Sequence, residues 1–255
     1  MKLIWDIEYN DIKNVNDFCN IYAETDFYNR RKDRNINKLN LDLSREFIWK
    51  AMVTCLLTTQ QNSSSNSPIS NFIRQSPFPL SLSMCELQVD LNTYVAETIS
   101  NFGQIRRNLK IADELDTNFK RLKKSDWAIF NAVISNLNRP ATDSIAQIEN
   151  ERMNAEMIAQ ELKGFGPKQS RNLLQILGLT MYELPIDSRV IKWLTNFGFP
   201  LKISSVGLQD NNYYNFVSDA IQNLCEKSKV IPCLLDAAIF ENGDKGEWKS
   251  SNIVF

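Results

Sequence analysis

The sequence predicts an all-α protein, and three observations support that prediction. Apolar residues recur at helical spacing in one segment after another. The connections are short, and no run of strands joined by Asn-Gly or Asp-Gly hairpin turns is present. Glycine and proline number only 8 each in 255 residues, which disfavours a loop-rich β protein. This length fits one large domain or two intimate ones, at roughly 100–200 residues per domain.

The clearest helix is expected from Ser44, an N-cap residue type, to the polar stretch that precedes the turn-forming segment 62–68. Upstream, the segment 14–28 has helical spacing and 2–9 is a short strand or irregular. The charged run 29–38 is expected to be a solvated loop. Further helices are expected at Ile69–Arg74, Ser83–Leu87, Asn92–Ile99, Ile105–Leu115, Asp126–Leu137, Asn154–Leu162, Lys168–Leu177, Ser188–Phe197 and Tyr213–Cys225.

Composition excludes several classes of protein. Twenty-nine basic residues against 30 acidic ones give a net charge of −1, so any surface that attracts a nucleic acid must be local. The absence of histidine excludes a histidine general base, a Ser-His-Asp triad and histidine metal sites. Five widely spaced cysteines without a CxxC pair argue against a disulfide framework or a zinc site. No signal peptide and no apolar run of ~20 residues is present, so we expect a cytoplasmic protein.

The most informative stretch is ELKGFGPKQSRNLL, which spans 161–174. A helix is expected to end near Leu162, and a new one begins with Pro167, which suits the first helical turn. Between them, Gly164 and Gly166 flank Phe165 in a tight hairpin that exposes backbone N–H groups. Such groups beside a helix N-terminus bind phosphate and would hold a DNA backbone without determining base sequence. An ordinary turn between two helices explains the same glycines.

Lys168 and Asp187 follow this hairpin 19 positions apart, each at the start of an expected helix. Separately, they are a solvated lysine and an N-cap. Together they suggest chemistry, because the positive end of a helix dipole favours a neutral, nucleophilic amine. A nearby carboxylate would stabilise a developing sugar cation. The pair suits cleavage of an N-glycosidic bond followed by Schiff-base chemistry at C1′.

The segments LKGFGPK, SRNLLQILG and LPIDSRV resemble the helix-hairpin-helix signature of the endonuclease III and 8-oxoguanine DNA glycosylase superfamily. That family has L-x-G-h-G-x-K, with h apolar, then an apolar helix and a P-h-D element. In lysine-bearing members this lysine is the nucleophile, which here is Lys168, and the aspartate matches Asp187. The resemblance implies a DNA glycosylase with AP-lyase activity. It also implies that Gly164, Phe165 and Gly166 contact double-stranded damaged DNA.

A second similarity lies in LLTTQQN, which spans 56–62. It resembles the family helix that ends in L-L-S-x-Q-x-T, a turn that enters the duplex. The resemblance implies that Gln60 fills the space left by the flipped base, and that Gln61 and Asn62 contact the orphan strand. A polar helix end with ordinary capping is the alternative. With this helix included, the resemblance extends from about Phe47 to Val190.

The C-terminal region departs from many endonuclease III relatives, which carry a four-cysteine iron–sulfur loop. Only Cys225 and Cys233 occur there, so we expect no cluster, no metal and no organic cofactor. This departure favours the 8-oxoguanine branch. By loose similarity Phe240 or Trp248 would stack on the base and Asp236 would accept a hydrogen bond from it. Aromatic packing of a C-terminal helix is the alternative.

Local charge agrees with a DNA partner. Seven basic residues oppose three acidic ones between positions 104 and 124, which suits phosphate contacts or simply a solvated helix face. Beside the hairpin, the positive charge of Lys168 is joined by that of Lys163, Arg171, Arg189 and Lys192, against Glu183 and Asp187. Of these, Arg189 is expected to bind DNA.

We therefore expect two helical domains, residues 46–180 and residues 1–45 plus 181–255, with the active site in the cleft between them. The first 45 residues are too short for the β-rich domain of larger 8-oxoguanine glycosylases, so a smaller bacterial or archaeal type is expected. The expected function is excision of an oxidised base, 8-oxoguanine favoured, by a monomer that associates with the nucleoid. The alternatives are an enzyme for oxidised pyrimidines, a monofunctional glycosylase, and a non-enzymatic helix-hairpin-helix DNA-binding module.

Overall fold

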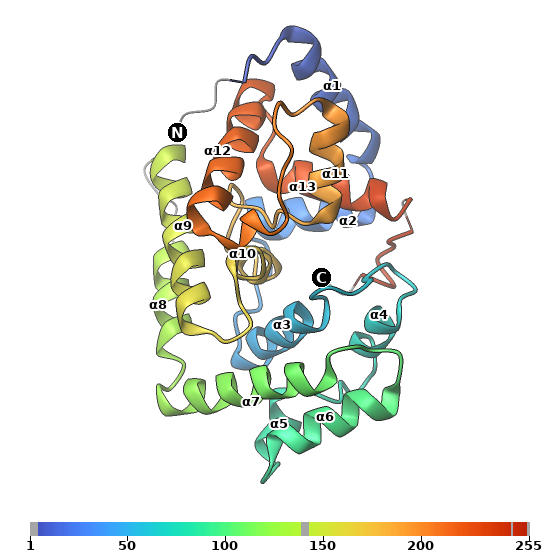
Figure 1. Cartoon of the computed structure of the whole chain (residues 1–255), viewed down its shortest axis with the longest axis vertical. Coiled ribbons are helices and arrows are strands. Elements are labelled where there is room, and N and C mark those ends of the chain that lie inside the picture. Colours follow the sequence, from blue (N-terminus) through green and yellow to red (C-terminus); the bar gives the residue numbers. More distant parts are fainter. Residues whose placement is uncertain (1–4, 139–142, 246, 254–255) are drawn as a thin grey trace.

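The computed structural model describes residues 5–138, 143–245 and 247–253, and every regular element within these ranges is helical (Figure 1). The all-α prediction is therefore confirmed. In chain order the elements are α1 (Tyr9–Tyr22), α2 (Asp26–Arg31), the π-helix η1 (Lys32–Ile36), α3 (Arg45–Leu57), α4 (Pro68–Ile73), α5 (Leu82–Glu86), α6 (Leu91–Phe102), α7 (Asn108–Lys124), α8 (Ala128–Leu137), α9 (Ser144–Glu161), α10 (Pro167–Ile176), α11 (Ser188–Phe197), the 3-10 helix η2 (Gly207–Gln209), α12 (Asn211–Ser228) and α13 (Pro232–Gly243).

Most expected helices are present, but several bounds differ. Helix α9 starts well before the expected residue 154, because Asp143 caps it by accepting a hydrogen bond from the Ala146 N–H. Helix α13 was not expected as a clear element. The segment 14–28 forms two helices, since Thr25 accepts a hydrogen bond from the Tyr28 N–H and starts α2 anew. None of the described helices is both long and apolar enough to cross a membrane.

The interpretation of the run 29–38 as a solvated loop is wrong. It forms the end of α2 and the whole of η1, and it buries Arg31 and Asn35, which are 4% and 0% exposed. The Asn35 amide donates to the carbonyls of Gln175 and Thr180, at 3.0 and 2.7 Å. Buried polar groups need such partners, and these come from distant parts of the chain.

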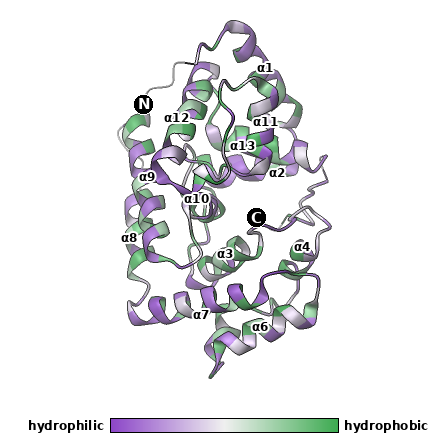
Figure 2. Ribbon diagram, viewed as in Figure 1, coloured by the Kyte–Doolittle hydropathy of each residue, from purple (hydrophilic) through white to green (hydrophobic). Residues whose placement is uncertain are grey.

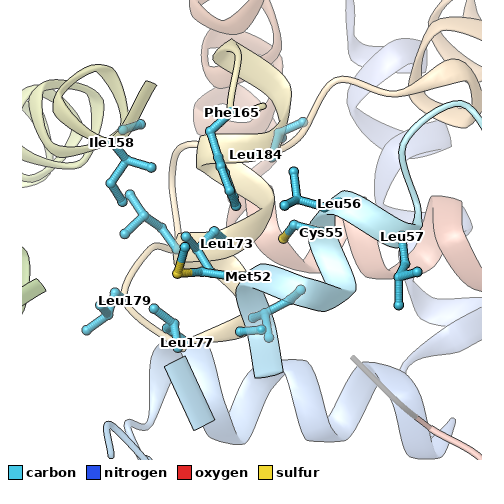
Figure 3. Packing of buried hydrophobic residues seen from close by; sticks show 14 of the residues in the cluster. Met52, Cys55, Leu56, Leu57, Ile158, Phe165, Leu173, Leu177, Leu179 and Leu184 are labelled. Atoms are coloured by element: carbon cyan, nitrogen blue, oxygen red, sulfur yellow. The ribbon is translucent and has the colours of Figure 1, made fainter. Parts of the chain in front are cut away.

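Helices α3 and α10 pack together at the centre of the molecule. Figure 3 shows Met52 and Cys55 of α3 facing Leu173 of α10. Ile158 of α9 lies on the other side of Leu173 from Cys55. Residues 51–57 of α3 are all buried, as in a helix that is covered all round. Helix α7 is amphipathic by contrast, and Figure 2 shows hydrophilic stretches along it at the edge of the molecule.

The helices form two groups (Figure 1). In one group α6 packs on α7, α8 on α9, and α9 and α3 on α10. In the other, the N-terminal α1 and α2 pack against the C-terminal α12 and α13. The Tyr22 hydroxyl donates to Asn242 at 2.8 Å, which joins residues 220 positions apart. The N-terminal and C-terminal segments therefore pack together. The division into residues 46–180 and residues 1–45 plus 181–255 stays a prediction.

Candidate active site

Lys168 and Asp187 line the same cleft, which has a volume of about 1220 Å³. Lys168 lies in the first turn of α10, where Gly166 is the N-cap and Pro167 opens the helix. Asp187 is the N-cap of α11. Most of the other residues singled out from the sequence line this cleft as well, namely Gln60, Gln61, Asn62, Gly164, Phe165, Gly166, Arg189, Asp236 and Phe240.

The hairpin between α9 and α10 requires glycine at one of its two positions. Gly164 has φ +84°, and a Cβ there would lie 2.7 Å from Cδ of Glu114 and 2.8 Å from Cδ2 of Leu56. Gly166 has an ordinary φ of −94°, and its Cβ would meet nothing closer than 3.7 Å. The intervening Phe165 is buried and anchors the hairpin in the core.

The hairpin is also clamped to α7. Asn118 Oδ1 accepts from the Lys163 N–H at 2.8 Å, and Asn118 Nδ2 donates to the Lys163 carbonyl at 2.9 Å. Because Asn118 is itself fully buried, these bonds hold the backbone in one conformation. The N–H groups at the start of α10 are therefore presented on a rigid support.

Lys168 is the candidate nucleophile of the cleft, and the nearby Cys55 thiol is not a competing one. Its amine lies 3.4 Å from Oε1 of Gln169, and its charge acts on the nearby Cys55 thiol. Burial nevertheless raises the pKa of Cys55 to about 12, so that thiol stays protonated. All five cysteines are buried with free thiols, and no group of three or more His, Cys, Asp or Glu in the described ranges could hold a metal ion.

Asp187 caps α11 and also lines the cleft. Its Oδ1 accepts from the N–H groups of Arg189 and Val190, at 2.8 and 3.1 Å, which is the N-cap role. Its Oδ2 lies 3.2 Å from Nη1 of Arg189, and the side chain faces the cleft. No hydrogen bond or ion pair joins Asp187 to Lys168 within the part of the chain that the structure describes.

The segment that leads from α10 to Asp187 is held by buried side chains. The Glu151 carboxylate accepts from the N–H groups of Met181, Tyr182 and Glu183, at 3.0, 2.8 and 2.8 Å. The Tyr214 hydroxyl donates to the Leu184 carbonyl at 2.9 Å and accepts from the N–H of Ile186 at 2.6 Å. This last bond holds the residue directly before Asp187.

In the turn after α3, the three neighbouring amide residues Gln60, Gln61 and Asn62 have different surroundings. Gln60 is exposed, has φ +57°, and its side chain makes no hydrogen bond to the described residues. Gln61 instead accepts from the Arg106 N–H at 2.7 Å and donates to the carbonyls of Leu57 and Arg106, both at 3.0 Å. Asn62 is exposed and accepts from the N–H of Ser64. Gln61 therefore braces the turn, while the Gln60 side chain is exposed at the cleft.

The basic residues divide into two groups. Arg106, Arg107 and Lys110 line the cleft, where the two arginines also donate to the carbonyls of Gln60 and Thr59. The later ones of the stretch lie outside the cleft, and three of them pair with carboxylates: Lys120 with Asp116, Arg121 with Glu161, and Lys123 with Glu86. Arg171, expected to add surface charge, is instead fully buried.

Asp236 and Phe240 of α13 line the cleft. Asp236 forms a buried ion pair with Arg31, at 2.8 Å. Burial raises the pKa of the Asp236 carboxyl, Arg31 opposes this shift, and Asp187 adds to it. The Phe240 ring stacks on Phe27, with centroids 4.6 Å apart, and the Arg189 guanidinium lies 4.3 Å from its centroid.

Sequence reasoning missed Phe27 and Arg31, although both line the cleft. Their i, i+4 spacing directly after the capping residue Thr25 was the available signal. Contrary to expectation, the structure does not bring Trp248 to the cleft. It is 1% exposed, and its ring packs against those of Phe27 and Phe240 at 6.2 and 5.5 Å. Its indole N–H donates to Asp244 at 2.6 Å, so it supports Phe240 from within the core.

The sequence matches no family model and no curated protein. Solved structures do match. The 8-oxoguanine DNA glycosylase of Methanocaldococcus jannaschii is 16% identical, with a TM-score of 0.63 over 94% of this chain and 98% of that one. The glycosylase/lyase of that organism, in complex with a 15mer DNA containing 8-oxoguanine, gives a TM-score of 0.64 at 16% identity over 96% and 98% of the two chains.

The 8-oxoguanine DNA glycosylase of Thermotoga maritima gives a TM-score of 0.66, at 17% identity over 91% of this chain and 96% of that one. Each match therefore covers nearly the whole of both chains. The expected fold is confirmed, since this chain has the all-helical fold of these 8-oxoguanine DNA glycosylases.

Proposed function

We propose that this protein is a DNA glycosylase with AP-lyase activity that excises an oxidised base, with 8-oxoguanine favoured. The observation that carries the proposal is that Lys168 and Asp187 begin two helices at one cleft, beside a rigid hairpin. The fold supports it, because similar structures are those of 8-oxoguanine glycosylases, one of them described as a glycosylase/lyase and bound to DNA that contains 8-oxoguanine.

In this proposal the substrate is double-stranded DNA, bound across the hairpin and the turn at the end of α3. Backbone N–H groups from Gly164 to Gly166 and the start of α10 meet the phosphates of the damaged strand. The exposed Gln60 enters the duplex and fills the space of the extruded nucleotide. Extrusion costs a few kcal/mol and exposes C1′ of the damaged nucleotide to the cleft.

The chemistry starts with the neutral amine of Lys168. Its lone pair forms a bond to C1′ while the bond from C1′ to the base breaks. The base leaves with the electron pair of the broken bond and takes up a proton. The Asp187 carboxylate stabilises the positive charge on the sugar. The amine nitrogen then loses a proton, and its lone pair forms a second bond to C1′ while the bond from C1′ to the ring oxygen O4′ breaks. O4′ keeps the electron pair of that bond and takes up a proton, which leaves an iminium at C1′. Loss of a proton from C2′ expels the 3′ phosphate, and water finally releases Lys168.

Asp236 and Phe240 are proposed to contact the base from α13. The Asp236 carboxylate, oriented by Arg31, accepts a hydrogen bond from the base, and Phe240 packs against it. Arg189 and Asn62 are proposed to contact DNA at the edges of the cleft. The reaction written above uses no cofactor, and we expect the protein to act as a monomer on nucleoid DNA.

Trapping with borohydride tests the proposal. Duplexes that contain 8-oxoguanine, thymine glycol or no lesion are incubated with the protein, borohydride is added, and covalent complexes are resolved by electrophoresis. We expect an adduct on the 8-oxoguanine duplex that is absent with Lys168→Gln. An adduct on thymine glycol alone would keep the mechanism and overturn the substrate. Bound DNA without an adduct would overturn the lyase mechanism, and base release would then separate a monofunctional glycosylase from a DNA-binding module.

A further inference from the structure

We infer that Gln169 is a positioning residue, which orients the Lys168 amine and ties it to the turn that carries Gln60. The inference rests on the proposed function, because it assigns a residue to the same reaction. Gln169 follows Lys168 directly in α10, is only 5% exposed, and contributes to the wall of the cleft. Its amide group has one side facing the end of α3 and the other facing Lys168.

The nitrogen of this amide holds the end of α3. Gln169 Nε2 donates to the Cys55 carbonyl at 2.7 Å and to the Thr59 hydroxyl. Cys55 lies in the last turn of α3, and its carbonyl also accepts from the hydroxyls of Thr58 and Thr59, both at 3.0 Å. Gln169 is therefore bonded to the residue directly before Gln60.

The oxygen of the same amide faces the proposed nucleophile. Oε1 accepts from the Lys168 amine at 3.4 Å and from the Asn172 amide at 3.3 Å. No other hydrogen-bond partner of the Lys168 amine lies within the described ranges. A neutral amine that donates one N–H to this oxygen has its lone pair directed elsewhere, and the cleft is the open side.

This arrangement links the two parts of the site that must act together. A small displacement of a nucleophile from its reactive position costs up to about 100-fold in rate. If the turn at Gln60 moves, the Thr59 hydroxyl and Gln169 move with it, and the amine of Lys168 loses its acceptor. Gln169 thus makes the orientation of the nucleophile depend on the turn that enters the duplex.

A purely structural role for Gln169 predicts different behaviour, so the test uses three variants. Gln169→Glu keeps the shape but adds a carboxylate beside the amine, which favours its ammonium form. Gln169→Met keeps the length and removes both the acceptor for Lys168 and the donor to Cys55 and Thr59. The matched control is Asn35→Ala. Asn35 donates one buried bond to Gln175, at the end of α10 opposite Lys168, and a second to Thr180, which follows that helix.

Two readouts are measured across pH for the wild type and the variants. The first is the single-turnover rate of borohydride trapping on 8-oxoguanine duplex at saturating protein. The second, which needs no DNA, is reductive methylation of Lys168 quantified by peptide mass spectrometry, with the exposed Lys192 as internal reference. We expect Gln169→Glu to need a pH higher by about one unit or more in both assays. We expect Gln169→Met to trap about tenfold more slowly even at saturating protein, where DNA affinity does not limit the rate.

Asn35→Ala should lose thermal stability and keep both wild-type pH profiles. The inference is overturned if the Gln169→Glu profiles coincide with those of the wild type, or if Asn35→Ala shifts them equally. If the wild type forms no adduct on any duplex, the proposed function fails, and the methylation profiles still decide whether Gln169 controls the Lys168 amine.

Discussion

Arg171 and Glu183 form an ion pair in which neither side chain is exposed to solvent. The pair joins α10, three residues after Lys168, to the segment that ends at Asp187. The Arg171 guanidinium also lies 4.3 Å from the centroid of the Tyr214 ring, and Tyr214 in turn bonds the N–H of Ile186. These buried contacts fix the position of Lys168 relative to Asp187, although these two proposed catalytic residues do not bond to each other.

Glu183→Ala is expected to destabilise the protein by about 3–5 kcal/mol, because it leaves Arg171 buried without its carboxylate. Urea unfolding measures the change. The control is Asp219→Ala, which removes an exposed carboxylate that pairs with Arg152, and it should cost less than about 1 kcal/mol. A Glu183→Ala loss as small as that of the control would contradict a structural role for the buried pair.

Glu241 predicts a dependence of stability on pH. Burial raises the pKa of its carboxyl, and Thr25 and Lys249 oppose the shift. A group whose pKa is higher in the folded state contributes stability that is complete below its unfolded pKa, near 4.3, and is lost as pH rises through the folded value. Glu241→Gln should therefore flatten the fall in the free energy of unfolding as the pH rises above about 4. Equal slopes for variant and wild type in urea titrations would refute this.

Gly164→Ala is expected to disrupt the hairpin, because it combines φ +84° with a Cβ too close to Glu114 and Leu56. We expect a loss of at least ~1–2 kcal/mol in stability and a marked loss of DNA affinity, measured by thermal unfolding and fluorescence anisotropy. Gly166→Ala is the matched control, since a Cβ there has room. It should keep the wild-type melting temperature, and equal destabilisation by both variants would contradict the geometry.

Alanine substitutions of the adjacent glutamines Gln60 and Gln61 should have different effects on stability and on DNA binding. Gln61→Ala removes three hydrogen bonds that brace the turn and should cost ~1–2 kcal/mol in stability. Gln60→Ala should leave the melting temperature unchanged and weaken the binding of lesion-containing duplex. Thermal unfolding and anisotropy titrations on the same two proteins test this, and a reversed order of effects would be incompatible with the structure.

Asp187→Asn separates the N-cap role of Asp187 from its proposed catalytic role. Asparagine is as good an N-cap as aspartate, so the melting temperature should stay close to that of the wild type. The variant lacks the negative charge proposed to stabilise the sugar cation, so the trapping rate should fall at least ~10²-fold. Asp187→Ala should lose the cap as well, at a cost of about 1 kcal/mol. Trapping at the wild-type rate by Asp187→Asn would remove Asp187 from the mechanism.

The sequence by itself determined the helical class, the hairpin and the spaced pair Lys168 and Asp187. These features depend on short-range chemistry. Apolar spacing defines a helix within a few turns, Gly164 supplies a conformation that other residues rarely adopt, and Asp187 caps the helix that follows it. Because features of this kind are local, they can be predicted from the sequence without knowledge of the folded chain.

Only the tertiary structure decided which polar side chains are buried and what they contact. Arg31 lies in a run that looks solvated, yet it pairs with Asp236, 205 positions away. Trp248 was expected to stack on a base and is enclosed by aromatic rings, whereas Gln169, which no motif singled out, contacts both Lys168 and the end of α3. The physical reason is that burial and long-range hydrogen bonds depend on which distant segments of the chain pack against each other. Local composition does not determine which segments these are.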